Sequence, residues 1–162
     1  MKHIRPYRDT DLQNLHAINV AGEPGVGAVS IDQLKSVIEL GHCTVAVDDT
    51  DNPLGFLLLH MPEAEYDSQN FKWFDDRYED FVYVDRIAVS PEARSQEVGA
   101  ALYAHAFEAF TGKALLIGCE VNAVPPNPRS LHFHQRLGFR QVGEKTYTAD
   151  YAVIYLARRL TV

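Results

Sequence analysis

Apolar positions along the chain follow two different periods, and these periods predict the elements of the fold. Runs of β-branched, aromatic and other apolar residues, bounded by Gly, Pro, Asp and Asn, are typical of strands. Such runs predict strands over residues 3–7, 43–47, 54–61, 83–89, 114–121, 139–147 and 151–160. Apolar residues spaced by three or four positions predict helices that begin at Asp9, Ser30, Val98 and Arg129.

The order of these elements, β-α-α-β-β-β-α-β-α-β-β, predicts the fold class. It indicates an α/β (α+β) sandwich with a central twisted, mixed but mostly antiparallel sheet of about seven strands, flanked by about four helices. The strands at 83–89 and 114–121 enclose a helix, so we expect them to pair in parallel through a right-handed crossover. The chain has 162 residues, which suits one domain, and we take 1–162 as a single domain.

Two segments stand outside this pattern. Residues 21–30 are rich in Gly and Pro, and we expect a flexible loop that touches the substrate. Their glycines do not indicate a nucleotide site, because the segment follows a helix and lacks Gly-Lys-Ser/Thr. Residues 63–80 hold seven acidic residues, two basic residues and five aromatic residues. An acidic loop is usually only solvated, but the aromatic residues also suit a packed lid, a dimer contact or a substrate wall.

Composition narrows the class of protein. The net charge of −7 argues against a nucleic-acid partner, and it is compatible both with attraction of a cationic amine and with simple solubility. Cys43 and Cys119 lie in strand-like runs, so we expect reduced core cysteines in a cytoplasmic protein. The longest apolar run, 54–59, is too short to cross a bilayer, and we expect no membrane segment. The seven histidines are scattered and no Cys-x-x-Cys occurs, so we expect no metal site.

The stretch 85–103 predicts a strand, a turn and the start of a helix. Pro91 ends the extended run, because proline cannot donate to a strand ladder. Helical spacing then begins at Val98, continues through Leu102, and places His105 on the apolar face as a core residue. A polar, Gly-containing turn before a helix presents free backbone N–H groups and the positive end of the helix dipole. This arrangement predicts a pyrophosphate-binding site.

Two motifs in this part of the chain point to a known family. The first is Ile87-Ala-Val-Ser-Pro-Glu92 followed by Arg94-Ser-Gln-Glu-Val-Gly99-Ala. The second is Asn127-Pro-Arg-Ser130-Leu-His-Phe133-His134-Gln-Arg-Leu137-Gly138-Phe139. In sequence, spacing and structural context, both resemble the signatures of the GNAT superfamily of acetyl-coenzyme A-dependent N-acetyltransferases. The order of elements also resembles the family fold, whose two parallel strands splay apart at the cofactor cleft.

The resemblance implies that acetyl-coenzyme A is bound as the acyl donor. Backbone N–H groups of residues 95–100 would bind its pyrophosphate, and strand 83–89 would pair with its pantetheine arm. A backbone N–H near Val89 would polarise the thioester carbonyl, and Asn127 would bind the arm or cap its own helix. The implied cofactor-binding residues are Ile87, Ala88, Val89, Arg94, Ser95, Gln96, Glu97, Val98, Gly99, Ala100 and Asn127. The chain departs from the family at Glu97, where the first motif has glycine, and at His134, where the second usually has tyrosine.

The resemblance also implies a general base and a general acid for acyl transfer. Asp85 and Glu120, on the two parallel strands, are the candidate bases, acting directly or through a water. Each has an alternative as a structural, salt-bridged carboxylate, with Arg86 as the partner of Asp85. His134 is the candidate acid for the departing thiolate, with a purely structural replacement of tyrosine as the alternative.

The resulting prediction is direct attack of a primary amine on acetyl-coenzyme A through a tetrahedral intermediate. A small amine, an amino acid or a peptide would each suit as acceptor, and a homodimer is also compatible with the sequence. The alternative is a non-catalytic acyl-coenzyme A-binding module or sensor with the same fold, which the departures at Glu97 and His134 keep open.

Overall fold

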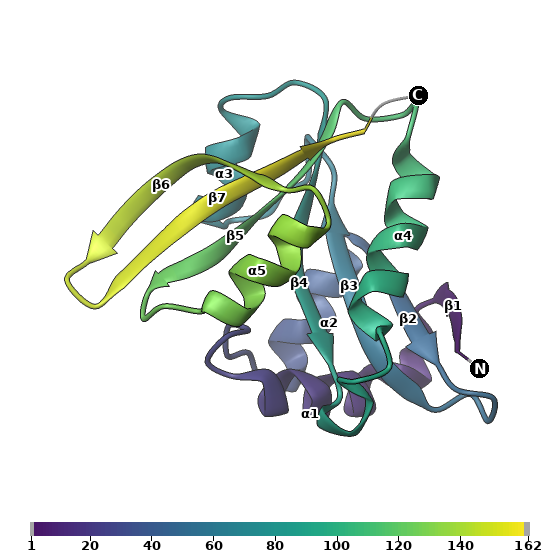
Figure 1. Cartoon of the computed structure of the whole chain (residues 1–162). Helices are drawn as coiled ribbons and strands as arrows, with labels where there is room; N and C mark the ends of the chain where they lie inside the picture. The colour runs from purple at the N-terminus through teal and green to yellow at the C-terminus, as the bar shows by residue number, and fades with distance from the viewer. Residues whose placement is uncertain (1, 161–162) are drawn as a thin grey trace.

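Seven strands form one sheet at the centre of the computed structural model, which describes residues 2–160 (Figure 1). The strands are β1 His3–Pro6, β2 His42–Val47, β3 Pro53–His60, β4 Phe81–Val89, β5 Leu116–Val124, β6 Arg140–Thr148 and β7 Tyr151–Arg159. Their order across the sheet is β1-β2-β3-β4-β5-β7-β6. Among these strands only β4 and β5 pair in parallel, and every other neighbouring pair is antiparallel. The predicted fold class and the predicted parallel pair are therefore confirmed.

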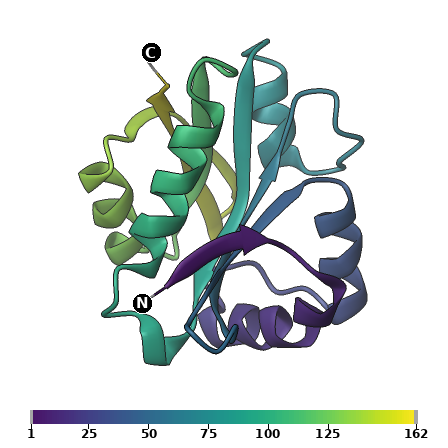
Figure 2. The ribbon, with the colours of Figure 1, turned by 90° about the vertical axis from the view of Figure 1, so that its right-hand side faces the viewer.

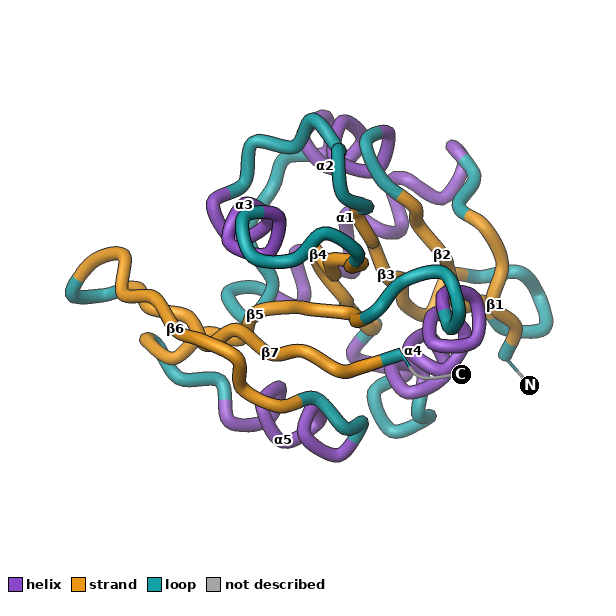
Figure 3. Tube along the Cα trace, turned by 90° about the horizontal axis from the view of Figure 1, so that it is seen from above, coloured by secondary structure: helices purple, strands orange, loops and turns teal. Residues whose placement is uncertain are grey.

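Helices cover both faces of the sheet (Figures 2 and 3). Within residues 2–160 they are α1 Leu12–Gly22, α2 Ile31–Glu39, α3 Gln69–Asp75, α4 Val98–Phe110 and α5 Pro128–Arg136, with short 3-10 turns at Asp9–Asp11 and Pro91–Ala93. Helices α1, α2 and α3 lie on one face, whereas α4 and α5 lie on the other. Helices and sheet thus form three layers, and the parallel pair runs through the middle one.

Strand β3 is buried on both faces. Leu57 and Leu59 pack into the cluster beneath α4, and Phe56 and Leu58 pack into the cluster beneath α1 and α2. All four side chains are at most 1% exposed. Burying a side chain of this size contributes roughly 1.5–3 kcal/mol, so this strand joins the two main halves of the core.

Two polar residues predicted at helix starts cap their helices, whereas Asp9, predicted to begin the first helix, lies in the 3-10 turn before α1 and does not cap it. Ser30 caps α2 through a capping box, in which its hydroxyl accepts from the Gln33 backbone N–H at 3.1 Å and the Gln33 side chain accepts from the Ser30 N–H at 2.8 Å. Asn127 caps α5, because its Oδ1 accepts from the Ser130 backbone N–H at 3.2 Å. Gly138 follows α5 with φ of +91°, a conformation that other residues adopt only with strain.

The predicted core position of His105 is wrong. The buried stripe of α4 runs through Val98, Leu102, Tyr103 and Ala106, and His105 is exposed. A helix advances about 100° per residue, so a face centred on Leu102 and Ala106 excludes the residue directly before Ala106.

The acidic, aromatic segment 63–80 contains the one α-helix, α3, that the sequence prediction did not include. Its seven acidic side chains are all exposed. Its aromatic side chains pack inward, with Phe71 and Phe74 in a third core cluster that also holds Tyr83 and Tyr155. Ser68 accepts from the Phe71 N–H at 3.2 Å and begins the helix. Short length and few aliphatic residues hide such a helix from the apolar periodicity on which the prediction relied.

Candidate active site

Strands β4 and β5 separate after a short paired stretch, and this separation forms the site. They pair only from Phe81 opposite Leu116 to Tyr83 opposite Gly118. The register of β4 against β3 then shifts, from Val84 opposite Leu59 to Arg86 opposite Leu58, so that Asp85 is the extra residue of a bulge. A bulge bends a strand and increases its twist, which turns the end of β4 away from β5.

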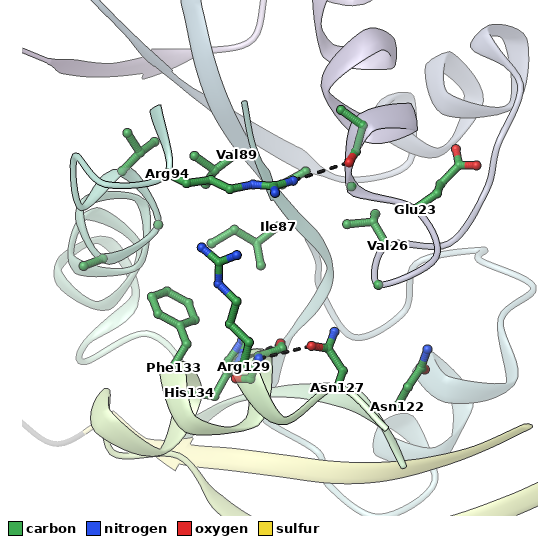
Figure 4. Close-up of a pocket in the computed structure, with 18 of the residues that line it drawn as sticks. Glu23, Val26, Ile87, Val89, Arg94, Asn122, Asn127, Arg129, Phe133 and His134 are labelled. Carbon is green, nitrogen blue, oxygen red and sulfur yellow. Dashed lines mark hydrogen bonds between the residues drawn. The ribbon is translucent and has the colours of Figure 1, made fainter. Parts of the chain in front are cut away.

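A cavity of about 910 Å³ opens between the separated strand ends (Figure 4). Its walls come from the α1–α2 loop, the end of β4, the turn before α4, and α5. Ten of the eleven predicted cofactor residues line it, namely Ile87, Ala88, Val89, Arg94, Ser95, Glu97, Val98, Gly99, Ala100 and Asn127. Gln96 is exposed and does not line it. The structure therefore gathers the first motif and the start of the second around one cavity.

Glu97 holds a strained backbone at the N-terminus of α4. Its φ and ψ are +57° and +30°, in the left-handed region, where a residue with a Cβ is roughly 1–2 kcal/mol less stable than in the right-handed one. The Glu97 side chain is exposed. The backbone conformation explains why glycine suits this position, since glycine adopts it without strain.

Gly99, two residues further, is required for close packing. A Cβ on Gly99 would lie 2.9 Å from Cζ of Phe133, so the glycine lets α5 approach α4. The N–H groups in the first turn of α4 have no acceptors within the helix, and a 13-residue helix concentrates positive potential there. This end of the cavity is suited to an anion such as a phosphate.

Arginines and an amide group extend the polar surface of this cavity. Arg94 is exposed, and its guanidinium donates to the Ala21 carbonyl at 3.4 Å (Figure 4). Arg129, on α5, extends into the cavity from the opposite side. Because Oδ1 of Asn127 caps α5, its Nδ2 group is the part of that side chain left to bind a ligand.

A second cavity, of about 480 Å³, lies deeper in the wedge and contains Glu120. It shares Ile87, Asn127 and His134 with the first cavity, so the two meet. The Tyr83 hydroxyl donates to Oε1 and Oε2 of Glu120 at 2.7 and 2.8 Å, and Nδ2 of Asn70 donates to Oε1 at 3.1 Å. Burial raises the pKa of Glu120 to about 8, although the hydrogen bond from Tyr83 opposes this rise. Such a carboxyl group exchanges a proton near neutral pH.

Asp85, the other predicted base, is held in an ion pair. Arg86 Nε donates to Asp85 Oδ2 at 2.7 Å, and the Tyr66 hydroxyl donates to Oδ1. The two charged side chains are only 5% and 9% exposed. Arg86 also donates to Oδ1 of Asn19 at 3.0 Å and to the Gly27 carbonyl at 3.1 Å. The salt-bridged alternative for Asp85 is therefore the arrangement found in the structure.

His134, the predicted acid, is buried where the two cavities meet and uses both ring nitrogens. Nδ1 lies 2.8 Å from the Ser130 carbonyl, which can only accept, so Nδ1 carries the proton. Nε2 lies 2.7 Å from the Tyr103 hydroxyl and therefore accepts from it in the neutral ring. Burial lowers the pKa of His134, which favours this neutral form.

Several residues around Glu120 were not identified from the sequence. Asn70 links the base to two tyrosines, because its Oδ1 accepts from Tyr147 at 2.5 Å and from Tyr155 at 2.8 Å. Tyr83 had a signal in the sequence, since alternation along its strand places it on the same face as Asp85. Asn70 had none, because only the fold brings the start of α3 next to β5.

Comparisons with known proteins agree with this arrangement. A sequence model of the acetyltransferase (GNAT) family matches residues 10–139. Among solved structures, a protein of the GNAT family from Desulfovibrio desulfuricans has a TM-score of 0.79 at 16% identity, covering 99% of each chain. The ribosomal-protein-S18-alanine N-acetyltransferase of Escherichia coli has a TM-score of 0.74 at 18% identity, covering 100% of this chain and 96% of its own. A phosphinothricin acetyltransferase from Sinorhizobium meliloti, in complex with AcCoA, has a TM-score of 0.72 at 18% identity, covering 99% and 89%.

Two further results are negative. A search of curated protein sequences gave no significant match. Across residues 2–160, none of the helices has the length and apolar character needed to cross a membrane.

Proposed function

We propose that this chain, which belongs to the acetyltransferase (GNAT) family, is an enzyme that transfers the acetyl group of acetyl-coenzyme A to a primary amine. The observation that carries the proposal is the position of Glu120. It lies in the deeper cavity, which meets the larger cavity around Ile87 and His134, and no cationic side chain contacts its carboxylate among the described residues. The larger cavity would hold acetyl-coenzyme A and the deeper one the amine.

The larger cavity offers groups suited to each part of acetyl-coenzyme A. The N–H groups at the start of α4 would bind the pyrophosphate, and Arg94 and Arg129 would add positive charge. The backbone of Ile87 and Val89 and the Nδ2 group of Asn127 would bind the pantetheine arm. A backbone N–H near Val89 would stabilise the oxyanion that forms on the thioester carbonyl. The complex of the structurally similar Sinorhizobium meliloti protein with AcCoA supports this assignment.

Glu120 would act as the general base. A primary amine arrives largely as an ammonium ion, and ionised Glu120 removes one proton from it, directly or through a water. Oε1 accepts from both Tyr83 and Asn70, whereas of these two donors only Tyr83 donates to Oε2, so Oε2 is the oxygen proposed to take the proton. The ion pair with Arg86 makes Asp85 the weaker candidate base.

The neutral amine nitrogen then attacks the thioester carbon and forms the new C–N bond of a tetrahedral intermediate. The C–S bond breaks as the intermediate collapses, and its electron pair leaves on sulfur. The second amine proton passes from nitrogen to solvent, the thiolate takes one proton from solvent or from the predicted acid to become free coenzyme A, and Glu120 returns its proton to solvent. A thiol has a pKa of about 8.5, so the thiolate is a competent leaving group without a strong acid.

The role of His134 as the acid stays a prediction. In the neutral ring the single N–H points to the Ser130 carbonyl, and Tyr103 donates to the other nitrogen. This pair can deliver a proton only if one of these hydrogen bonds is exchanged. We therefore expect His134 to contribute less to the rate than Glu120.

The direct test measures free thiol released from acetyl-coenzyme A in the presence of a panel of primary amines. Amine-dependent thiol release together with the N-acetylated product supports the proposal. Tight binding of acetyl-coenzyme A with no turnover on any amine supports the alternative, a non-catalytic acyl-coenzyme A-binding module.

A further inference from the structure

The deeper cavity has a charge pattern that discriminates between amines, and this inference rests on the proposed function. Its lining residues come from the α1–α2 loop, from the start of α3 and the segment before it, from β4, β5 and the first residue of β7, and from α4, α5 and the loop before α5. Its volume of about 480 Å³ is within the usual range for a small-molecule site. We call it the acceptor chamber.

Arg86 is the only arginine or lysine that lines the acceptor chamber within residues 2–160. Its guanidinium is held through Nε by Asp85 at 2.7 Å, and through Nη1 by Oδ1 of Asn19 at 3.0 Å and by the Gly27 carbonyl at 3.1 Å. The Arg86 side chain is only 9% exposed. A ligand carboxylate would meet a guanidinium whose charge Asp85 already neutralises, and drawing Arg86 away from Asp85 would leave that buried carboxylate without its cationic partner, which is strongly unfavourable.

The remaining lining favours a cationic amine with an uncharged body. Glu120 supplies a carboxyl group to the ammonium, and its pKa lets it take up the proton. The rings of Tyr66, Tyr83 and Tyr151 supply apolar and aromatic surface. The hydroxyls of Tyr66 and Tyr83 are both engaged with carboxylates, so these groups already have partners in the empty chamber.

One alternative anchor for a carboxylate lies outside the chamber. Lys145, on β6, sits 4.8 Å from the centre of the Tyr147 ring and donates to Gln69 at 3.5 Å. Lys145 is exposed and does not line the chamber. A carboxylate attached next to the reacting nitrogen would stay close to Glu120, a residue that repels it when ionised.

We propose that the acceptor is a small primary amine with an aromatic or alkyl body and no carboxylate beside the reacting nitrogen, and that free amino acids are rejected. The chamber would thus select by the absence of a usable cation as much as by the presence of Glu120. Selectivity of this kind arises because the carboxylate of a bound amino acid would have no cationic partner in the chamber.

Matched pairs of amines test the proposal. Tyramine and tyrosine differ only in the carboxylate, as do phenethylamine and phenylalanine. We expect binding of the amine to the protein saturated with coenzyme A, measured by calorimetry, to be at least about thirtyfold tighter than that of the amino acid. Equal or tighter binding of the amino acids would overturn the proposal. Because binding is measured without turnover, failed acetyl transfer would count against the proposed function and leave the binding ratio to decide the acceptor class. A peptide amide that binds more tightly than tyramine would overturn the small-amine assignment.

A charge variant tests the cause of the selectivity. Asp85→Asn removes the partner charge of Arg86 and should lower the tyramine-to-tyrosine binding ratio by about tenfold or more. Glu108→Gln, an exposed change on α4, controls for net charge and should leave the ratio unchanged. An unchanged ratio in folded Asp85→Asn would contradict the proposal. If Asp85→Asn does not fold, Glu120→Gln replaces it as the variant: it removes the negative charge that attracts the ammonium and repels the carboxylate, so the tyramine-to-tyrosine binding ratio should fall, and an unchanged ratio would contradict the proposal.

Discussion

Tyr83 and Glu120 join strands β4 and β5 by side chains at the point where their backbones separate. The Tyr83 hydroxyl donates to both carboxylate oxygens, at 2.7 and 2.8 Å. Tyr83 is also the last residue of β4 in register with β5, opposite Gly118. A Cβ at Gly118 would collide with the ring of Phe74, so the apex of the wedge is closely packed. The proposed base is therefore fixed by the core itself.

The pH dependence of the rate should follow Glu120. Its raised pKa, about 8, means that the carboxylate is the minor form below that pH. With an acceptor whose own pKa is well above 9, we expect kcat/KM to rise with pH and to level off above about pH 8.

Tyr83→Phe provides the matched variant for this profile. The Tyr83 hydroxyl stabilises the ionised carboxylate, so its loss should raise the pKa of Glu120 further. The acid limb of the profile should then move to higher pH, by roughly half a unit to one unit. An acid limb that stays in place, or moves to lower pH, would show that a group other than Glu120 controls it.

The stability of the protein should also record the buried carboxyl group. The pKa of Glu120 is about 8 in the folded protein against an ordinary value of 4.5, so between these values the folded protein binds more protons than the unfolded chain. Stability from this group is present at low pH and is lost as the pH rises through this window. Glu120→Gln cannot ionise and should raise the free energy of unfolding by roughly 1–3 kcal/mol at about pH 9, with little change near pH 4.5. Denaturant unfolding at both pH values measures the difference, and a variant destabilised equally at both would refute the prediction.

The left-handed conformation at Glu97 predicts a gain from glycine. Glu97→Gly removes the strain of the Cβ and takes a carboxylate away from the end of the cavity suited to phosphate. We expect the free energy of unfolding to rise by up to about 1 kcal/mol and the Kd of coenzyme A to fall about threefold. Glu97→Gln separates the two effects, because it removes the charge and keeps the strain. Weaker coenzyme A binding in the glycine variant would contradict this account of the turn.

A change at His134 should affect stability more than catalysis. His134→Phe leaves the buried Tyr103 hydroxyl without its acceptor, and an unsatisfied buried group of this kind costs roughly 1–3 kcal/mol. With a neutral ring as the starting state, we expect kcat to fall less than about tenfold. His132→Phe, an exposed change on the same helix, is the control. A fall of a hundredfold or more in folded His134→Phe would instead establish the histidine as the main acid.

The sequence predicted the framework of the cofactor cleft because local signals define it. Pro91, the polar turn and the apolar spacing from Val98 mark a strand, a turn and a helix without reference to the rest of the chain. The same local signals could not show that Glu97 adopts a left-handed backbone, which follows from how the turn meets α4.

The environment of the base depended on contacts distant in sequence. The sequence placed Glu120 on one of the two parallel strands, but its donors come from Tyr83 on β4 and Asn70 on α3. The ion pair of Asp85 with Arg86 was weighed as an alternative, yet no local pattern distinguishes a paired carboxylate from a free one. The fold distinguishes the two carboxylates, because it pairs Asp85 with a guanidinium and gives Glu120 only neutral donors.

The turnover of Glu120→Gln tests the central claim most directly. Thiol release with a saturating amine should be measured above about pH 8, alongside the Kd of acetyl-coenzyme A and with Glu108→Gln as the control. We expect Glu120→Gln to bind acetyl-coenzyme A like the wild type while kcat falls by about 10²–10⁴-fold. A folded Glu120→Gln protein that retains kcat within about threefold of the wild type would contradict the account.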